Sequence, residues 1–138
     1  MIIFGPTQAS YDLDLGPIIL SDWYHANYSD VVAGLFDTNY NFDKFAPKSQ
    51  NNLINGKNSF DCSKVGAGRT CRPNAPLSKF GFKRGKVHRL RLINAGAEAL
   101  QRFSIDGHTL TVIANDFVPV VPYKTNSVTL GVSSLCPR

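Results

Sequence analysis

Histidine side chains are the first candidates for chemistry in this sequence. His25, His88 and His108 are widely separated, and they form no His-x-His or His-x-x-x-His pair. Transition-metal sites are commonly seeded by such local pairs, because two ligands on one strand or turn reduce the entropy lost in assembling the rest. The spacing therefore favours histidines that hydrogen-bond to backbone groups over histidines that bind a metal.

The cysteines indicate a cross-link more than a metal site. Cys62 and Cys71 flank a short segment rich in Gly, Lys and Arg, which we interpret as an exposed loop. They can form a disulfide if the compartment is oxidising. Asn27 begins an Asn-Tyr-Ser glycosylation acceptor pattern, which points to the same kind of compartment. Cys136 has no obvious partner in the sequence.

The sequence gives little support for a catalytic triad that would activate a serine nucleophile. Asp106 and His108 could join a serine in a triad, but the Asp-Gly-His run is explained by the backbone needs of a tight turn. The sequence also contains no Gly-x-Ser-x-Gly elbow. We therefore do not expect hydrolase chemistry.

A basic stretch leaves two interpretations open. Lysines and arginines gather between Lys79 and Arg91, with Phe80 and Phe82 interleaved. Such a surface could bind phosphates and stack bases as a copper-free, stand-alone binding module on the face Lys83–Arg91. Alternatively, the stretch is a solvated turn followed by a strand with arginines on its outer face. The net charge of only +5 and the lack of an RNP-like motif favour the second interpretation, without nucleic acid as a partner.

Short apolar runs broken by turn residues predict an all-β fold around these side chains. Strands are expected at residues 15–24, 87–92 and 127–132, the second with Leu90 and Leu92 on one face and arginines on the other. Residues 26–50 look least like a strand, with helical turns expected at 30–36. The sequence thus predicts a β-sandwich with a long, partly helical insertion.

Turn residues predict two hairpins and one edge strand. Asn55-Gly56 is a strong signal for a type I′ turn between residues 52–54 and 57–60. Asp106-Gly107 predicts a second hairpin between residues 102–105 and 108–113. Pro119 and Pro122 confine the segment between them to a sheet edge or a loop, because proline cannot donate to a ladder.

Composition sets the broad class. The 138 residues are 43% hydrophobic and 18% charged, which are values of a single globular domain. No apolar run approaches the roughly 18 residues of a membrane-spanning helix, so no membrane association is expected. The chain start lacks a basic region and meets Pro6 at once, which predicts no signal peptide in this chain.

Several runs, in order along the chain, resemble the middle cupredoxin (plastocyanin-like) domain of fungal, ascomycete-type laccases, which are multicopper oxidases. The runs are Tyr-Asp-Leu-Asp-Leu-Gly-Pro at 11–17, Leu-Ser-Asp-Trp-Tyr-His at 20–25, Asn-Leu-Ile-Asn-Gly-Lys at 52–57, His-Arg-Leu-Arg-Leu-Ile-Asn at 88–94, Phe-Ser-Ile-Asp-Gly-His at 103–108 and Leu-Thr-Val-Ile-Ala-Asn-Asp-Phe-Val-Pro-Val at 110–120. Together they span nearly all of residues 3–132. Several independent motifs in the family's order are far more specific than any one.

The resemblance implies a secreted, three-domain enzyme that oxidises phenols by one electron and reduces dioxygen to water at copper sites. In that family the copper ligands come in His-x-His pairs and a His-Cys-His run from the first and third domains, and none of these motifs is present here. The expected fold is therefore a cupredoxin-like Greek-key β-sandwich that packs against the first and third domains and binds no copper itself. As an isolated chain it is expected to be inactive.

The resemblance also implies boundaries and one substrate contact. Residues 1–10 would be the end of the first domain and a linker, residues 11–132 the second domain, and residues 133–138 a tail outside the family pattern, which leaves the sandwich incomplete at its C-terminal edge. A truncated, non-functional product is a further interpretation. In laccases an acidic residue just before the Phe-Ser-Ile-Asp-Gly-His run contacts the phenol, and Glu98 matches it. Otherwise Glu98 is simply an exposed loop acid.

Overall fold

The computed structural model describes residues 9–36, 48–66 and 68–137. The expected linker residues 1–8 and the part of the insertion at 37–47 lie outside the described residues. The elements, in chain order, are β1 Leu13–Trp23, α1 Tyr28–Leu35, β2 Asn51–Ile54, the 3-10 helix η2 Cys62–Lys64, β3 His88–Asn94, β4 Gln101–Phe103, β5 Leu110–Asn115, β6 Val118–Thr125, β7 Val128–Leu130 and β8 Leu135–Pro137.

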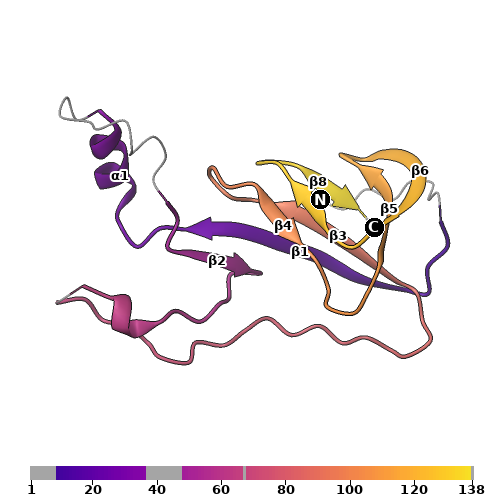
Figure 1. Ribbon diagram of the computed structural model, residues 1–138, viewed down its shortest axis with the longest axis horizontal. Coiled ribbons are helices and arrows are strands. Elements are labelled where there is room, and N and C mark those ends of the chain that lie inside the picture. Colours follow the sequence, from indigo (N-terminus) through magenta and orange to yellow (C-terminus); the bar gives the residue numbers. More distant parts are fainter. Residues whose placement is uncertain (1–8, 37–47, 67, 138) are drawn as a thin grey trace.

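Strands dominate the fold and form three partial sheets. The largest has the order β2-β1-β3-β8, and the pairs β4-β7 and β5-β6 form two further sheets. β1 and β3 run parallel, whereas β2 and β8 pair antiparallel with their neighbours. Figure 1 shows β1 running along the long axis of the molecule, with α1 beyond its end and the β5–β6 hairpin at the opposite end. The predicted all-β sandwich with a partly helical insertion is confirmed.

The core lies between the four-stranded sheet and the shorter strands. β1 and β3 alternate as half-buried strands must, and they direct Ile18, Leu20, Leu90 and Leu92 into one apolar cluster. Val112 of β5, with Val128 and Leu130 of β7, closes this cluster from the other side. The predicted two-faced strand at 87–92 is therefore confirmed.

The first predicted turn is correct, but its second arm is not a strand. Asn55 and Gly56 both have positive φ, 50° and 71°, as a type I′ turn requires. Beyond the turn a single bridge joins Lys57 to Ile54, and the chain then leaves the sheet. Asn58 explains the departure, because its amide Nδ2 donates to the carbonyl of Asn52 at 2.7 Å and replaces a ladder bond.

The second predicted hairpin is wrong. β4 pairs with β7 and β5 pairs with β6, so the strands on either side of Asp106-Gly107 belong to different sheets. The turn itself exists: the His108 amide donates to the carbonyl of Ile105 at 3.0 Å, and Gly107 has φ of 71°. Asp106 does not share that positive φ, so the turn is not type I′ and lets the chain cross between sheets instead of reversing within one.

The remaining segments follow their sequence signals. α1 covers most of the expected helical turns at 30–36. β6, which contains both prolines, pairs with β5 alone, as an edge strand would. Within the tail expected at 133–138, the backbone of Leu135–Pro137 pairs with β3 as β8. In the described part of the chain no helix has the length and apolar character needed to span a membrane.

Candidate functional site

Glu98 lies at a cleft of about 570 Å³ beyond the carboxyl ends of β1 and β3. The cleft is formed by the end of β1, the helix α1 and the loop after β3, and Figure 1 shows these segments at the α1 end of the molecule. Its apolar wall comes from Trp23 and from one stripe of α1: Tyr28, Val31, Val32 and Leu35. This i, i+3, i+4, i+7 stripe faces the cleft and has no buried member. The exposed Glu98 carboxylate therefore borders an aromatic and aliphatic surface.

Asp22 fixes the loop that carries Glu98. The inward-facing positions of β1 are Ile18, Leu20 and then Asp22, a residue that is 8% exposed. One carboxylate oxygen accepts the amide of Ala97 at 2.8 Å, and the other accepts the amides of Glu98 at 2.9 Å and Ala99 at 3.0 Å. Burial alone would raise the pKa of Asp22, but these amide hydrogen bonds outweigh it and hold the pKa below its usual value. Asp22 is therefore a charged, buried anchor.

Asn94 holds the same loop from β3. It is 1% exposed and occupies the inward position after Leu90 and Leu92. Its Nδ2 donates to the carbonyl of Ala99 at 2.9 Å, and its Oδ1 accepts the amide of Gly96 at 2.9 Å. Little space is left at Gly96: a Cβ atom would lie 3.0 Å from Asn94 Oδ1 and 3.1 Å from the Asp22 carboxyl, so these neighbours would have to move by a few tenths of an ångström. The adjacent parallel strands β1 and β3 thus each end in a buried polar residue, and both residues hydrogen-bond to the loop after β3.

Tyr24 contacts the Glu98 side chain directly. Its hydroxyl donates to Glu98 Oε2 at 3.3 Å. Burial, the negative charges of Asp22 and Glu98, and this hydrogen bond together raise the pKa of Tyr24 above its ordinary value near 10. Tyr24 therefore stays a neutral donor at physiological pH and occupies one of the two Glu98 oxygens.

The histidines do not converge on a metal site. His25 packs against Phe60, with 4.5 Å between ring centroids. His88 Nε2 accepts the amide of Lys83 at 3.0 Å, and His108 Nδ1 lies 2.9 Å from the carbonyl of Asp106. Among the described residues no three His, Cys, Asp or Glu side chains gather closely enough to hold a metal ion.

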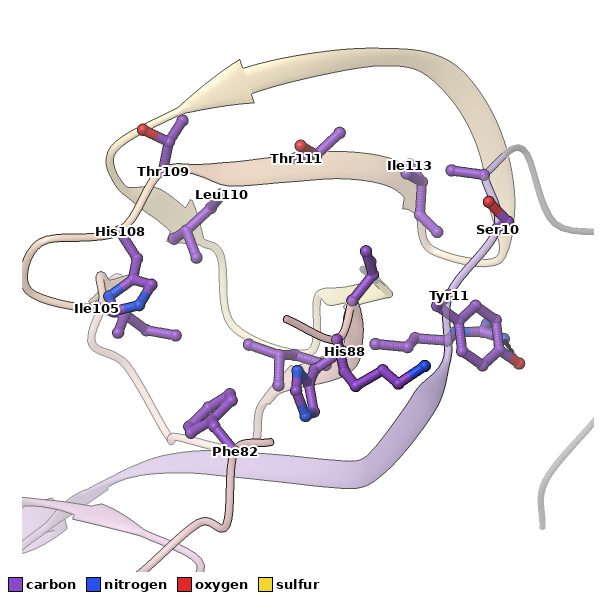
Figure 2. A pocket seen from close by; sticks show the side chains of 15 residues that line it. Ser10, Tyr11, Phe82, His88, Ile105, His108, Thr109, Leu110, Thr111 and Ile113 are labelled. Atoms are coloured by element: carbon purple, nitrogen blue, oxygen red, sulfur yellow. Dashed lines mark hydrogen bonds between the residues drawn. The ribbon is translucent and has the colours of Figure 1, made fainter. Parts of the chain in front are cut away.

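A second cleft, of about 410 Å³, lies between β3 and β5. Figure 2 shows Phe82 beside His88 at one side of it and His108 on the turn before Leu110. The Phe82 and His88 rings meet edge to face, with 5.2 Å between centroids. Each histidine thus has one ring nitrogen at a backbone group, and the two do not come together with a third ligand residue among the described residues.

Three of the six lysines and arginines between Lys79 and Arg91 make side-chain contacts within the described part of the fold. Arg91 pairs with Asp14 at 3.4 Å, and both side chains are mostly buried. Arg89 donates to the hydroxyl of Tyr11 at 3.2 Å and lies 5.2 Å from the centre of the same ring. Lys86 pairs with Asp12 at 3.1 Å. These contacts favour the interpretation of a structural strand over that of a free polyanion-binding surface.

The other candidate residues lie away from Glu98. The structure joins Cys62 and Cys71 through a disulfide with Cα atoms 5.7 Å apart, closing the loop after Asp61. Arg69 in that loop donates to the carbonyl of His25 at 3.0 Å, so the loop supports the segment after Tyr24. Asn27 caps α1 through its backbone position alone and its side chain is exposed.

The sequence pattern alone does not single out Asp22, Asn94 or the α1 stripe, although a signal exists for each. In Ile18-x-Leu20-x-Asp22 and Leu90-x-Leu92-x-Asn94 the alternation of inward positions ends on a polar residue. A polar side chain that continues an apolar face must find buried partners, which here are loop amides. The α1 residues show helical spacing, but spacing alone does not tell a cleft wall from a core face.

The fold is a cupredoxin-like β-sandwich, with partial sheets around one shared core. Comparisons with known proteins identify its family. The multicopper oxidase (Cu-oxidase) family model matches residues 14–135. Oxidoreductase OpS5 of Beauveria bassiana is 42% identical over 96% of this chain, and Laccase-2 of Botryotinia fuckeliana is 41% identical over 96%. The crystal structure of the laccase from Botrytis aclada superposes with a TM-score of 0.83 at 40% identity, covering 99% of this chain and 24% of that chain.

The chain therefore belongs to the multicopper oxidase family. It spans 21% of the length of the OpS5 oxidoreductase and 22% of that of Laccase-2. The resemblance to fungal laccases is thereby confirmed.

Proposed function

We propose that this chain is the middle cupredoxin-like domain of a longer, laccase-type multicopper oxidase, with residues 11–132 as the body of the domain and residues 1–10 as the end of the preceding one. It supplies part of the phenol pocket and packs between the first and third domains. The observation that carries the proposal is the Glu98 carboxylate at the mouth of an aromatic and aliphatic cleft. A phenol matches both features, because it joins an apolar ring to one acidic hydroxyl.

Glu98 acts as the proton acceptor in this proposal. Tyr24 binds Oε2, which leaves Oε1 for the substrate hydroxyl. As the phenol loses an electron its O–H becomes strongly acidic; that bond breaks, a new O–H bond forms on Glu98, and a phenoxyl radical leaves. The balanced reaction is four phenols and one dioxygen giving four phenoxyl radicals and two waters.

The described residues do not fit a copper centre, because their histidines are dispersed and bonded to backbone or stacked. Copper, which the family implies, is accordingly proposed to be held by the other domains, which accept the electron. We further propose that the parent enzyme is secreted, which suits a Cys62–Cys71 disulfide and a glycan on Asn27.

Kinetics on the intact oxidase test the role of Glu98. Glu98→Gln keeps the shape and removes the proton acceptor, so kcat/KM for a phenol should fall by about 10²-fold relative to kcat/KM for ferrocyanide, which gives up an electron and no proton. Asp106→Asn, which neutralises an exposed turn carboxylate remote from the cleft, is the matched control and should leave that ratio unchanged. An unchanged phenol-to-ferrocyanide ratio in Glu98→Gln would show that Glu98 is an ordinary loop acid.

A further inference from the structure

The Asp22 carboxylate is placed unusually for a residue of a β-strand. It lies at the end of β1 on the face that points into the core, and it is nearly inaccessible to solvent. A buried carboxylate is costly unless hydrogen bonds compensate for the lost water. Within the described residues that compensation comes from main-chain amides of residues 75 to 77 positions away in the sequence.

Those amides belong to three consecutive residues, and the middle one is Glu98. Bonds to residues 97, 98 and 99 from one carboxylate fix the backbone on both sides of the Glu98 Cα atom. Asn94 fixes the loop at Gly96 and Ala99, and the Tyr24 hydroxyl fixes the far end of the Glu98 side chain. Glu98 is thus held at its backbone and at its carboxylate, although it lies in an exposed loop.

We propose that Asp22 is a positioning residue for Glu98, an inference that rests on the proposed function of Glu98 as the phenol's proton acceptor. Asp22 does not touch the substrate. It holds the loop that carries Glu98 beside the cleft, where a misplacement of the carboxylate by about 1 Å can cost as much as 10²-fold in rate. Of the two carboxylates that line the cleft among the described residues, that of Asp22 is thereby committed to loop amides, which leaves Glu98 as the group that meets the substrate.

A double-mutant cycle on the intact oxidase separates this role from a merely structural one. The variants are Asp22→Asn, Glu98→Gln and both together, and the measured quantity is the ratio of kcat/KM for a phenol to that for ferrocyanide. Asp22→Asn should lower the ratio by roughly 10-fold. If Asp22 acts through Glu98, the double variant should lie within about twofold of Glu98→Gln alone, because the effects of coupled residues do not add.

The possible results distinguish a failure of the Asp22 role from a failure of the Glu98 role. If Glu98→Gln lowers the ratio while Asp22→Asn does not, or if the two effects multiply, Asp22 does not position Glu98 and the proposed function stands. If Glu98→Gln leaves the ratio unchanged, the proposed role of Glu98 fails and the positioning role fails with it.

A second variant covers the case in which Asp22→Asn does not fold. Gly96→Ala displaces the same loop while leaving Asp22 in place, because its Cβ would press on Asn94 and Asp22. It should lower the phenol-to-ferrocyanide ratio in the same direction. Gly81→Ala, where a Cβ meets nothing within 4 Å, is its matched control. Equal ratios for these two variants would overturn the positioning role.

Discussion

Replacing Asp22 with asparagine should destabilise the fold, and the size of the effect follows from its three hydrogen bonds. In its better orientation the oxygen of the new side-chain amide would accept from Glu98 and Ala99, while its NH₂ group would face the amide of Ala97, donor against donor. One charge-assisted bond is lost and two become neutral. At about 1.5–3 kcal/mol for a charged bond and about 0.5–1.5 kcal/mol for a neutral one, offset by the carboxylate's desolvation, the net loss is about 2 kcal/mol.

The pH dependence of this loss gives the prediction a second test. Because the folded-state pKa of Asp22 is lowered, its stabilisation is present above the unfolded value near 3.8 and disappears as the pH falls through the folded-state pKa. The difference in unfolding free energy between the native chain and Asp22→Asn should therefore be largest near pH 6 and shrink in acid. Asp12 and Asp61, whose pKa values hydrogen bonds also lower, are present in both proteins and cancel in the comparison.

Urea unfolding of the two chains, followed by circular dichroism at several pH values, measures this directly. A loss of about 2 kcal/mol should shift the urea midpoint by about 1–2 M for a domain of this size. Asp106→Asn should stay within about 0.5 kcal/mol of the native chain, as surface substitutions do. An Asp22→Asn chain as stable as the control at pH 6, or a difference that persists in strong acid, would show that the charged hydrogen bonds of Asp22 do not stabilise the fold.

Three further outcomes follow from the geometry. Gly96→Ala should cost about 1 kcal/mol, because crowding of the new Cβ outweighs the stabilisation that comes from a less flexible unfolded chain, whereas Gly81→Ala should be neutral or slightly stabilising; equal unfolding midpoints for the two would contradict the close approach. Glu98→Gln should lower the pKa of Tyr24 toward its ordinary value, seen by NMR of the tyrosine Cζ carbon, and an unmoved Tyr24 signal would mean that the two groups do not interact. Under denaturing, non-reducing conditions one of the three cysteines should react with a thiol reagent, and all three after reduction; three reactive thiols from the start would exclude the loop disulfide.

The sequence could predict the elements whose determinants are local. The alternation in β3, the positive-φ turn at Asn55-Gly56 and the edge position of the strand with Pro119 each rest on properties of adjacent residues, and the structure has all three. The hairpin at Asp106-Gly107 could not be predicted correctly. A turn signal specifies that the chain bends, but pairing depends on which distant strand offers the better partner, and β4 and β5 each pair elsewhere.

In the candidate site, too, local features could be predicted and long-range contacts could not. Glu98 could be named from the motif that follows it, but its surroundings depend on contacts across more than 70 residues. Asp22 and Asn94 come together only because β1 and β3 are parallel neighbours that end at one edge, a pairing that periodicity does not reveal. The ion pair between Arg91 and Asp14 likewise depends on the pairing of β1 with β3.

The most direct test of the central claim is to sequence the mature message on both sides of the segment that encodes this chain. If the chain is the middle domain of a laccase, the message contains one continuous reading frame with His-x-His pairs upstream and a His-Cys-His run downstream, so that flanking domains supply the copper ligands absent from the described residues. A message that starts at Met1 and stops after Arg138 would contradict the assignment to a longer oxidase, because this product would then lack the domains that an oxidase needs.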